Sequence, residues 1–335
     1  MVSMKDIARA CGVSVATVSK ALNGQPDIGE ETRARITETA KEMGYMANAA
    51  ARALKTNRTY NLGVLLTDER RSGLSHEYFT AMLESFKAMA ETCGYDVTFI
   101  HRNVGGKATS YLQHCLYRGV DGVLIACVDF TSPEVRELAE SKIPLVTVDR
   151  VFENRMAVLS DNVGGVSALV RHAYGKGHRK IAFLHGENSS VTEKRLEGFR
   201  STCRELGLEI PEEYIIGCVY QDPDRCAEAT RRLLQLPDRP TCILFPDDFS
   251  YIGGHNALTE AGLRVPEDIS VMGYNGIQLA RVMHLTTYSQ NAAALGRTAA
   301  DRLIRLIEDP KSTEAEQIMV SGSLLEGTSV LDINR

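Results

Sequence analysis

The chain has 335 residues, of which 44% are hydrophobic and 24% are charged, and its formal net charge is −5. This length exceeds the roughly 100 to 200 residues of one domain, so we expect two or three folding units, and the composition excludes a collagen-like, disordered or disulfide-rich chain. No apolar run approaches the roughly 18 residues of a membrane span, and the charged N-terminus argues against a signal peptide, so we expect a cytoplasmic protein without a membrane segment.

Motifs of catalytic and metal sites are missing from the sequence. The eight cysteines form no CxxC pair, and the eight histidines show no HxxxH or HExxH spacing. No P-loop, GxGxxG or GxSxG motif occurs, and the phosphate-loop-like stretch 174–180 lacks the Lys-Ser/Thr ending. We therefore expect no enzyme, no catalytic residues, no metal and no cofactor.

Charge is divided unevenly along the chain. Residues 1–58 hold nine Lys and Arg against six Asp and Glu, whereas the remainder holds 29 against 37. This asymmetry indicates a small basic head on an acidic body.

Three short helices are predicted in the head, over 3–12, 14–23 and 30–43. Ser14 caps the second helix after a turn at Gly12, and this helix–turn–helix arrangement places a helix N-terminus in a DNA major groove. The outward positions are Val15, Ala16, Thr17, Ser19 and Lys20. Val and Ala suit thymine methyls, Lys20 suits guanine or phosphate, and the hydroxyls suit phosphate. The competing interpretation is a plain helical bundle.

The connector 45–58 is rich in alanine. Alanine favours helix, but about eight residues form only a marginal helix in water. We therefore expect a helix that forms conditionally.

Beyond residue 60, short apolar segments alternate with helical ones, which predicts parallel sheets covered on both faces. The predicted strands are 62–67, 96–101, 121–127, 144–149, 157–160, 180–185, 214–219, 242–246 and 269–274. The predicted helices include 75–93, 110–118, 164–175, 192–206 and 222–234. Because so many strands exceed one sheet of ordinary size, we expect two βα subdomains.

Polar residues follow several of these strands. They are Asp68, Arg70, Arg71, Asp129, Asp149, Arg150, Asp161, Asn162, Asp247, Asp248 and Asn275. Ligands of open α/β sheets bind beyond the carboxyl ends of the strands, so this pattern predicts a ligand cleft. Some of these residues are expected to cap helices instead.

Longer motifs carry a family resemblance over essentially the whole chain. They are MKDIARACGVSVATVSKALNG and ETRARITETAKEMGYMANAAARAL near the N-terminus, VDR at 148–150, SDNVGG at 160–165, GHRKIAFLHG at 177–186, KRLEGF at 194–199, LRVPEDISVMGYN at 263–275 and LTTYSQ at 285–290. The chain closely resembles the lactose-repressor (LacI/GalR) family of bacterial transcription regulators.

The resemblance implies an α/β fold with three parts: a helix-turn-helix head at 1–45, a hinge helix or linker at 46–58, and a body at 59–335. The body would be periplasmic-binding-protein-like, with two doubly wound βα subdomains. Their expected ranges are 59–160 with 290–321 for the N-subdomain, and 161–289 with 322–335 for the C-subdomain.

The resemblance also implies roles in DNA binding. Val15, Ala16 and Lys20 match base-reading positions, while Ser14, Thr17 and Ser19 complete the contact set. In the hinge, the implied contacts are Asn48, Ala51, Leu54 and Lys55. Leu54 would wedge into a central minor-groove step, which costs unstacking of a few kcal/mol and permits a bent duplex that wraps more protein surface.

The body is expected to bind a small effector: a sugar, sugar acid or sugar phosphate. The implied contacts are Arg70, Asp149, Arg195, Tyr220, Asp247, Asn275 and Gln290. Sugar binders of the family usually carry aspartate where this chain has Asn275, and this change together with the extra arginines favours an anionic effector. Asp247, which stands where asparagine is usual, opposes that preference.

These features predict a homodimeric regulator, which we expect to be a repressor, that binds a pseudo-palindromic operator in double-stranded DNA. The sequence ends without a heptad helix, which favours a dimer over a tail-linked tetramer. Two alternatives stay open: control by a phosphorylated protein partner, and a solute-binding module that delivers sugar to a transporter.

Overall fold

The computed structural model describes residues 2–46, 58–67 and 73–334. The chain forms two compact units, Met1–Thr59 and Tyr60–Arg335. The hinge contacts inferred above (Asn48, Ala51, Leu54 and Lys55) and the cleft residue Arg70 lie outside the described residues.

The first unit contains the three predicted head helices, α1 (Met4–Cys11), α2 (Val15–Leu22) and α3 (Glu30–Glu42). Gly12 has φ 64°, a left-handed conformation that glycine adopts without strain, and it turns the chain between α1 and α2. Ser14 caps α2 because its hydroxyl accepts a hydrogen bond from the Thr17 amide at 3.1 Å. The buried core of this unit comprises Ile7, Ala8, Val18, Ala21, Ile36 and Ala40.

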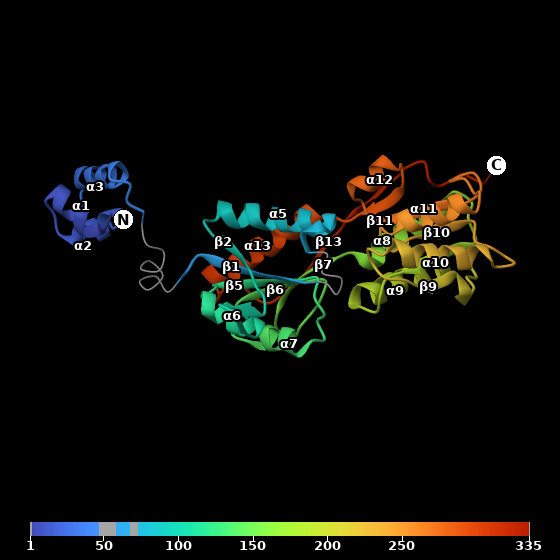
Figure 1. The fold of residues 1–335 in the computed structure, drawn as a ribbon, viewed down its shortest axis with the longest axis horizontal. Helices are drawn as coiled ribbons and strands as arrows, with labels where there is room; N and C mark the ends of the chain where they lie inside the picture. The colour runs from blue at the N-terminus through green and yellow to red at the C-terminus, as the bar shows by residue number, and fades with distance from the viewer. Residues whose placement is uncertain (1, 47–57, 68–72, 335) are drawn as a thin grey trace. The chain divides into compact units, whose positions relative to one another are not determined.

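The second unit contains two six-stranded sheets, each covered by helices on both faces (Figure 1). The first sheet has the order β13 (Gln317–Val320), β7 (Met156–Ser160), β6 (Leu145–Val148), β5 (Gly122–Ala126), β1 (Asn61–Leu66), β2 (Asp96–Phe99), and its strand pairs are parallel. The second has the order β14 (Ser323–Leu325), β12 (Thr286–Ser289), β11 (Ser270–Asn275), β10 (Cys242–Leu244), β8 (Ile181–His185), β9 (Ile215–Gly217), and only the β12–β14 pair is antiparallel.

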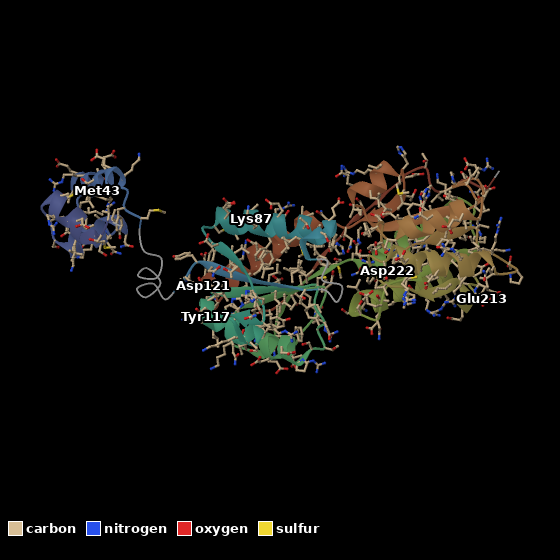
Figure 2. All side chains as sticks on the ribbon, viewed as in Figure 1. Met43, Lys87, Tyr117, Asp121, Glu213 and Asp222 are labelled. Atoms are coloured by element: carbon tan, nitrogen blue, oxygen red, sulfur yellow. The ribbon has the colours of Figure 1, made fainter. Side chains whose placement is uncertain are left out.

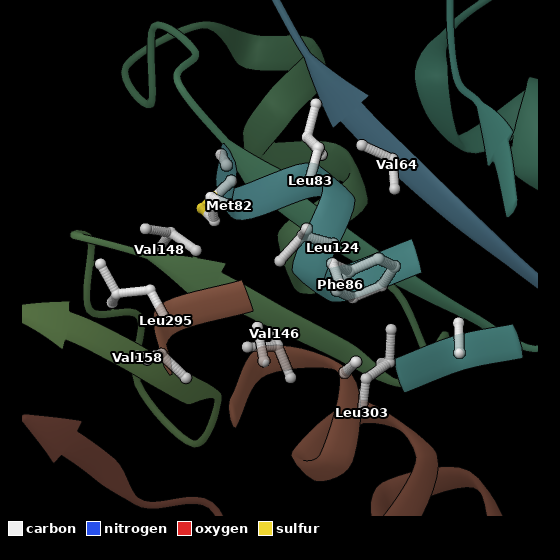
Figure 3. Packing of buried hydrophobic residues seen from close by; sticks show 14 of the residues in the cluster. Val64, Met82, Leu83, Phe86, Leu124, Val146, Val148, Val158, Leu295 and Leu303 are labelled. Carbon is white, nitrogen blue, oxygen red and sulfur yellow. The ribbon is translucent and has the colours of Figure 1, made fainter. Parts of the chain in front are cut away.

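Side chains of the first sheet alternate between two cores, as expected for strands buried on both faces. Leu124 of β5 packs toward α5 (Glu77–Thr92) and α13 (Ala292–Glu308), and its neighbours Val123 and Ile125 pack toward α6 (Tyr111–Arg118) and α7 (Pro133–Glu140). Figure 3 shows the α5 and α13 side of the sheet. Its packed residues include Val64, Val146, Val158, Met82, Phe86, Leu295 and Leu303.

The second sheet is built in the same way. Phe183 and Leu244 pack toward α8 (Asn162–Gly175) and α9 (Ser190–Glu205). On the other face, Leu184 and Ile243 pack toward α10 (Pro223–Leu234) and α11 (Tyr251–Glu260). The short α12 (Gln278–Val282) follows β11. The predicted fold class, a helix-turn-helix head with a doubly wound α/β body, is confirmed.

Each of the nine predicted strand segments overlaps an observed strand, but β12, β13, β14 and a small hairpin of β3 (Asn103–Val104) and β4 (Lys107–Ala108) were not predicted. β13 and β14 lie at sheet edges and are half exposed, so they lack a buried apolar run. Charged and polar side chains cover the outside of the second unit, where Lys87 of α5 and Tyr117 of α6 project from the helices (Figure 2). None of the helices in the described part of the chain is both long and apolar enough for a bilayer crossing.

Candidate functional site

A cavity of about 290 Å³ in the second unit is lined by residues from both sheets and their helices. Asp149 and Arg150 follow β6, whereas Asp247 follows β10 and Gln290 follows β12. These positions lie at the carboxyl ends of parallel strands, where α/β folds bind ligands. The cavity therefore collects the polar strand ends of two sheets around one space.

Every predicted effector residue in the described ranges lines this cavity. They are Asp149, Arg195, Tyr220, Asp247, Asn275 and Gln290. Three other described strand-end residues do not line it: Asp161 caps α8, Asn162 accepts a hydrogen bond from Arg195, and Asp248 is fully buried. The strand-end rule thus predicted residues that line one cavity, but it did not separate the lining residues from those with a structural role.

Arg195 is a buried cation at the cavity wall, with 5% of its surface exposed. Its Nε donates to Asn162 Oδ1 at 2.9 Å, and its Nη1 donates to the Pro246 carbonyl at 3.0 Å. The guanidinium carbon lies 3.8 Å from the centre of the Tyr274 ring, which is a cation–π distance. Among the described residues, none accepts a hydrogen bond from Nη2. The guanidinium is therefore held in one position, and its Nη2 group keeps N–H donors that no described residue uses.

Asp149 has a left-handed backbone with φ 56° and a carboxylate that faces Ser160. Its Oδ1 accepts from the Ser160 amide at 2.6 Å, and its Oδ2 accepts from the Ser160 hydroxyl at 3.0 Å. Burial raises the pKa of Asp149 above its usual value. The Asp149 carbonyl also accepts from the Ser190 hydroxyl of α9 at 3.0 Å, which links the two sheets' subdomains beside the cavity.

Asp247 reaches the cavity, but its carboxylate is already occupied. It accepts from the amide and side chain of Gln221 at 2.9 and 3.0 Å. It also accepts from the amide and hydroxyl of Ser250, both at 2.8 Å. A carboxylate has about four acceptor sites, so this residue is saturated by the protein. Within the structure this carboxylate holds Gln221 in the cavity wall, and the role of Asp247 as a direct effector contact stays a prediction.

Asn275 and Gln290 form a pair at the end of β11. Gln290 Nε2 donates to Asn275 Oδ1 at 2.8 Å, so the Asn275 amide N–H groups are left to point elsewhere. Asn275 has φ 105°, an unusual backbone conformation for a residue with a side chain. The turn after it is held by the buried Asp248, which accepts from the amides of Gly276 and Ile277 at 2.7 and 2.9 Å.

Tyr220 covers one side of the cavity. Its hydroxyl lies 3.0 Å from Thr192 Oγ1, and its amide donates to Glu187 Oε2 at 2.9 Å. A Cβ on Gly186 would lie 2.1 Å from the Tyr220 ring, so glycine is required there for the tyrosine to fit.

Several lining residues were not among the predicted contacts. They include His76, Phe79, Phe130, Glu187 and Gln221. Phe130 and Glu187 lie shortly after β5 and β8, where the strand-end rule applies to them as well. Phe79 lies inside α5, and no strand-end signal marks it.

The predicted reading face of α2 is open to solvent in the first unit. Val15 has 41% of its surface exposed, Ala16 and Lys20 are also exposed, and Val18 and Ala21 face the core. The hydroxyls of Ser14 and Thr17 lie 2.9 Å apart at the cap, while Ser19 is partly buried. The Lys20 ammonium forms an ion pair with Asp27.

Comparisons with known proteins agree with both units. Residues 3–48 match the family model described as bacterial regulatory proteins, lacI family, and residues 170–330 match a periplasmic binding protein-like domain. The chain is 30% identical to the HTH-type transcriptional repressor PurR of Mannheimia succiniciproducens, over 99% of this chain and 100% of that protein. It is 32% identical to PurR of Escherichia coli O139:H28, over 99% of this chain and 98% of that protein.

Solved structures show the same fold. The lac repressor dimer bound to operator and the anti-inducer ONPF matches with a TM-score of 0.81 at 24% identity, over 98% of this chain and 99% of that one. The complex of the transcriptional regulator CelR with cellobiose matches with a TM-score of 0.70 at 23% identity, over 98% and 100% of the two chains. The curated relatives are named as transcriptional repressors and not as enzymes. The chain belongs to the lacI family of bacterial regulatory proteins and is a DNA-binding transcriptional regulator.

Proposed function

We propose that this regulator is a homodimeric repressor whose affinity for a pseudo-palindromic operator is set by a small sugar-derived effector in the cavity. The observation that carries this proposal is the convergence of Asp149, Arg195, Asn275 and Gln290 on one cavity between two sheets, in a chain that also carries an exposed helix-turn-helix face. The proposal applies to the dimer, since two heads are needed for two half-sites.

On DNA, Val15, Ala16 and Lys20 would contact base edges of each half-site, because their side chains are exposed on α2. Ser14, Thr17 and Ser19 lie near the N-terminus of the same helix and would contact phosphates. The hinge contacts Asn48, Ala51, Leu54 and Lys55 remain inferences from the sequence. If the head reads the bases and the hinge contacts DNA of any sequence, changing Val15 or Ala16 should alter which operator is preferred. Changing Leu54 should weaken binding to nearly all operators.

In the cavity, the unpaired groups favour an effector that combines hydroxyls with an acidic group. Arg195 Nη2 has no acceptor among the described residues, and Arg150 also lines the cavity. Asp247, which would oppose an anion, has its oxygens occupied by four donors. The faces of Phe79, Phe130 and Tyr220 supply apolar surface of the kind that packs on a sugar ring. We therefore propose a sugar acid or sugar phosphate ahead of a neutral sugar.

The test is a selection of bound sequences from random duplex DNA by the full-length protein, followed by release assays. We expect a pseudo-palindrome spanning about two helical turns. Fluorescence anisotropy of that operator with neutral sugars, sugar acids and sugar phosphates should reveal a change in affinity of about five- to 150-fold for one class. Failure to select a palindrome would contradict operator binding, and a response to neutral sugars alone would contradict the acidic effector.

A further inference from the structure

Asp27 lies in the turn between α2 and α3, and its carboxylate accepts a hydrogen bond from the ammonium of Lys20. Both side chains are about half exposed, at 51% each. Lys20 is the one charged residue of α2, so this ion pair determines the charge of the exposed helix face.

The backbone of the turn is fixed on both sides of Asp27. Arg33 of α3 donates from Nη2 to the carbonyls of Gln25 and Ile28, at 2.7 and 3.2 Å. The Gln25 amide donates to the Lys20 carbonyl at 3.0 Å. The neighbouring Ile28 side chain packs on the core of the head. Asp27 is therefore held beside Lys20 by the fold and does not depend on a loose loop.

The ion pair between Lys20 and Asp27 stabilises the fold little, because exposed pairs of this kind contribute almost nothing to the free energy of unfolding. On DNA, the carboxylate acts against binding in general. It adds a negative charge next to the phosphates, and it occupies the ammonium that would otherwise displace a counterion. Asp27 therefore lowers the affinity of the head for non-specific DNA. Better discrimination between base pairs would offset that loss.

We propose that Asp27 is a specificity-determining residue, which together with Lys20 reads a single G·C base pair in each half-site. This inference rests on the proposed binding of α2 in the major groove. The ammonium donates to guanine O6 or N7, and the carboxylate accepts from the cytosine N4 amino group. The donor and the acceptor are already side by side in the free protein, so the pair is arranged before DNA binds.

The same arrangement disfavours the other base pairs. Replacing cytosine by thymine sets the O4 acceptor against the carboxylate, and replacing guanine by adenine sets the N6 donor against the ammonium. Lysine by itself has three donors on a flexible stem and binds phosphates or guanines with little discrimination. Asp27 therefore supplies the unfavourable contact that specificity requires.

The test compares full-length protein with its Asp27→Asn variant in the same DNA selection. Asp27→Asn should reduce the preference for G·C at one position of each half-site by about fivefold or more, the lower end of what one mismatched base pair costs. Non-specific DNA should bind more tightly, and the plot of log affinity against log salt should steepen by about one for each head whose Lys20 gains a phosphate. Thermal unfolding should be almost unchanged, since the side chain is exposed.

Two further variants isolate the cause. Glu38→Gln removes an equal charge from an exposed position of α3 and should leave the selected sequence unchanged. In a Lys20→Ala background, adding Asp27→Asn should change the G·C preference less than it does in the unaltered protein, because Lys20 holds the carboxylate beside the base pair.

Selected sequences that match between Asp27→Asn and Glu38→Gln would overturn the inference, as would an undiminished effect of Asp27→Asn in the Lys20→Ala background. Both results differ from a failure of the proposed function, in which the unaltered protein would select no palindrome.

Discussion

The polar residues around the cavity differ in whether the protein itself uses their hydrogen-bonding groups. Asp247 and Asp248 are buried carboxylates whose oxygens accept hydrogen bonds from backbone and side-chain donors of the protein. Arg195 and Asn275 instead keep N–H groups that are not used within the described residues. The carboxylates thus stabilise the structure around the cavity, and the donors are the groups that we propose would contact a ligand.

Asn275→Asp tests this assignment. It keeps the oxygen that accepts from Gln290 and replaces the amide nitrogen by a negatively charged oxygen. Repulsion should weaken binding of a sugar acid by about tenfold or more, which corresponds to roughly 1.4 kcal/mol, while a neutral sugar should lose less. Isothermal titration with a matched acid and neutral sugar measures both values. Asn154→Asp is the control, since it makes the same change at an exposed position outside the cavity.

Asp248→Asn tests the buried carboxylate through pH. Burial raises the pKa of Asp248 to about 7 from a reference value of 3.8. Between these pH values the folded protein holds a proton that the unfolded chain releases, so this residue's contribution to stability is complete below pH 4 and is lost as pH rises through 7. The free energy of unfolding should fall relative to the variant by up to about 4 kcal/mol between pH 4 and 8.

Urea unfolding of both proteins across that range gives the difference directly. The asparagine keeps an oxygen for the Gly276 and Ile277 amides and places an amino group toward the Thr287 hydroxyl, which now donates to Asp248 at 2.7 Å. The variant should therefore fold. Parallel curves for the two proteins would show that the carboxylate titrates outside this range.

The helices α13 and α5 pack closely against each other where they cover one face of the first sheet. Gly296 of α13 lies against α5, where an added Cβ would be 2.0 Å from the Met82 carbonyl and 2.9 Å from the Phe86 amide. Both neighbours are backbone atoms, so neither can move without bending α5. The helix pair therefore depends on a residue with no side chain.

Gly296→Ala should lower the free energy of unfolding by about 1 to 3 kcal/mol, the usual cost of overpacking, or more because the clash is with backbone. Chemical denaturation measures the change. Gly175→Ala is the matched control, since it also lies in a helix, at the end of α8, and its added Cβ would meet no atom within 4 Å. The control should be neutral or stabilise by up to about 1 kcal/mol. Equal effects of the two substitutions would contradict the packing argument.

Elements with strong local patterns were predicted from the sequence, and those without were not. The strands β5 and β8 are continuous apolar runs, and α2 has its cap and turn residues in place. The strand β12 is Thr-Thr-Tyr-Ser and is mostly buried by its neighbours in the sheet, although all four of its residues carry a hydroxyl group. Its burial comes from pairing with β11, a contact between distant residues that local periodicity does not contain.

Three connecting segments of the chain join the two sheets of the second unit. These follow β7, β12 and β13, at residues 161, 290–291 and 321–322. Cavity residues lie next to two of them: Asp149 binds Ser160, and Gln290 binds Asn275. An effector held at these residues would act where the two sheets are connected, which supports control of DNA affinity by binding in the cavity.

Effector and operator must influence each other equally if both bind one protein in two conformations. The factor by which saturating effector changes operator affinity should equal the factor by which saturating operator changes effector affinity. Anisotropy with labelled operator gives the first value, and calorimetric titration of effector into the protein–operator complex gives the second. Unequal factors would show that the effector acts by another route, such as a second site.

The sequence by itself determined the family, the head helices, the alternation of strands and helices, and the positions from which the cavity is built. These depend on local patterns: caps, turn glycines, apolar runs and polar residues at strand ends. The tertiary structure decided what each polar residue does. Asp247 and Asn275 look equivalent as strand-end residues, yet one is saturated by Gln221 and Ser250 and the other keeps its amide N–H groups. Likewise the pairing of Lys20 with Asp27 depends on Arg33 holding the turn. Hydrogen-bond partners come from distant segments that meet only on folding, so no local pattern records them.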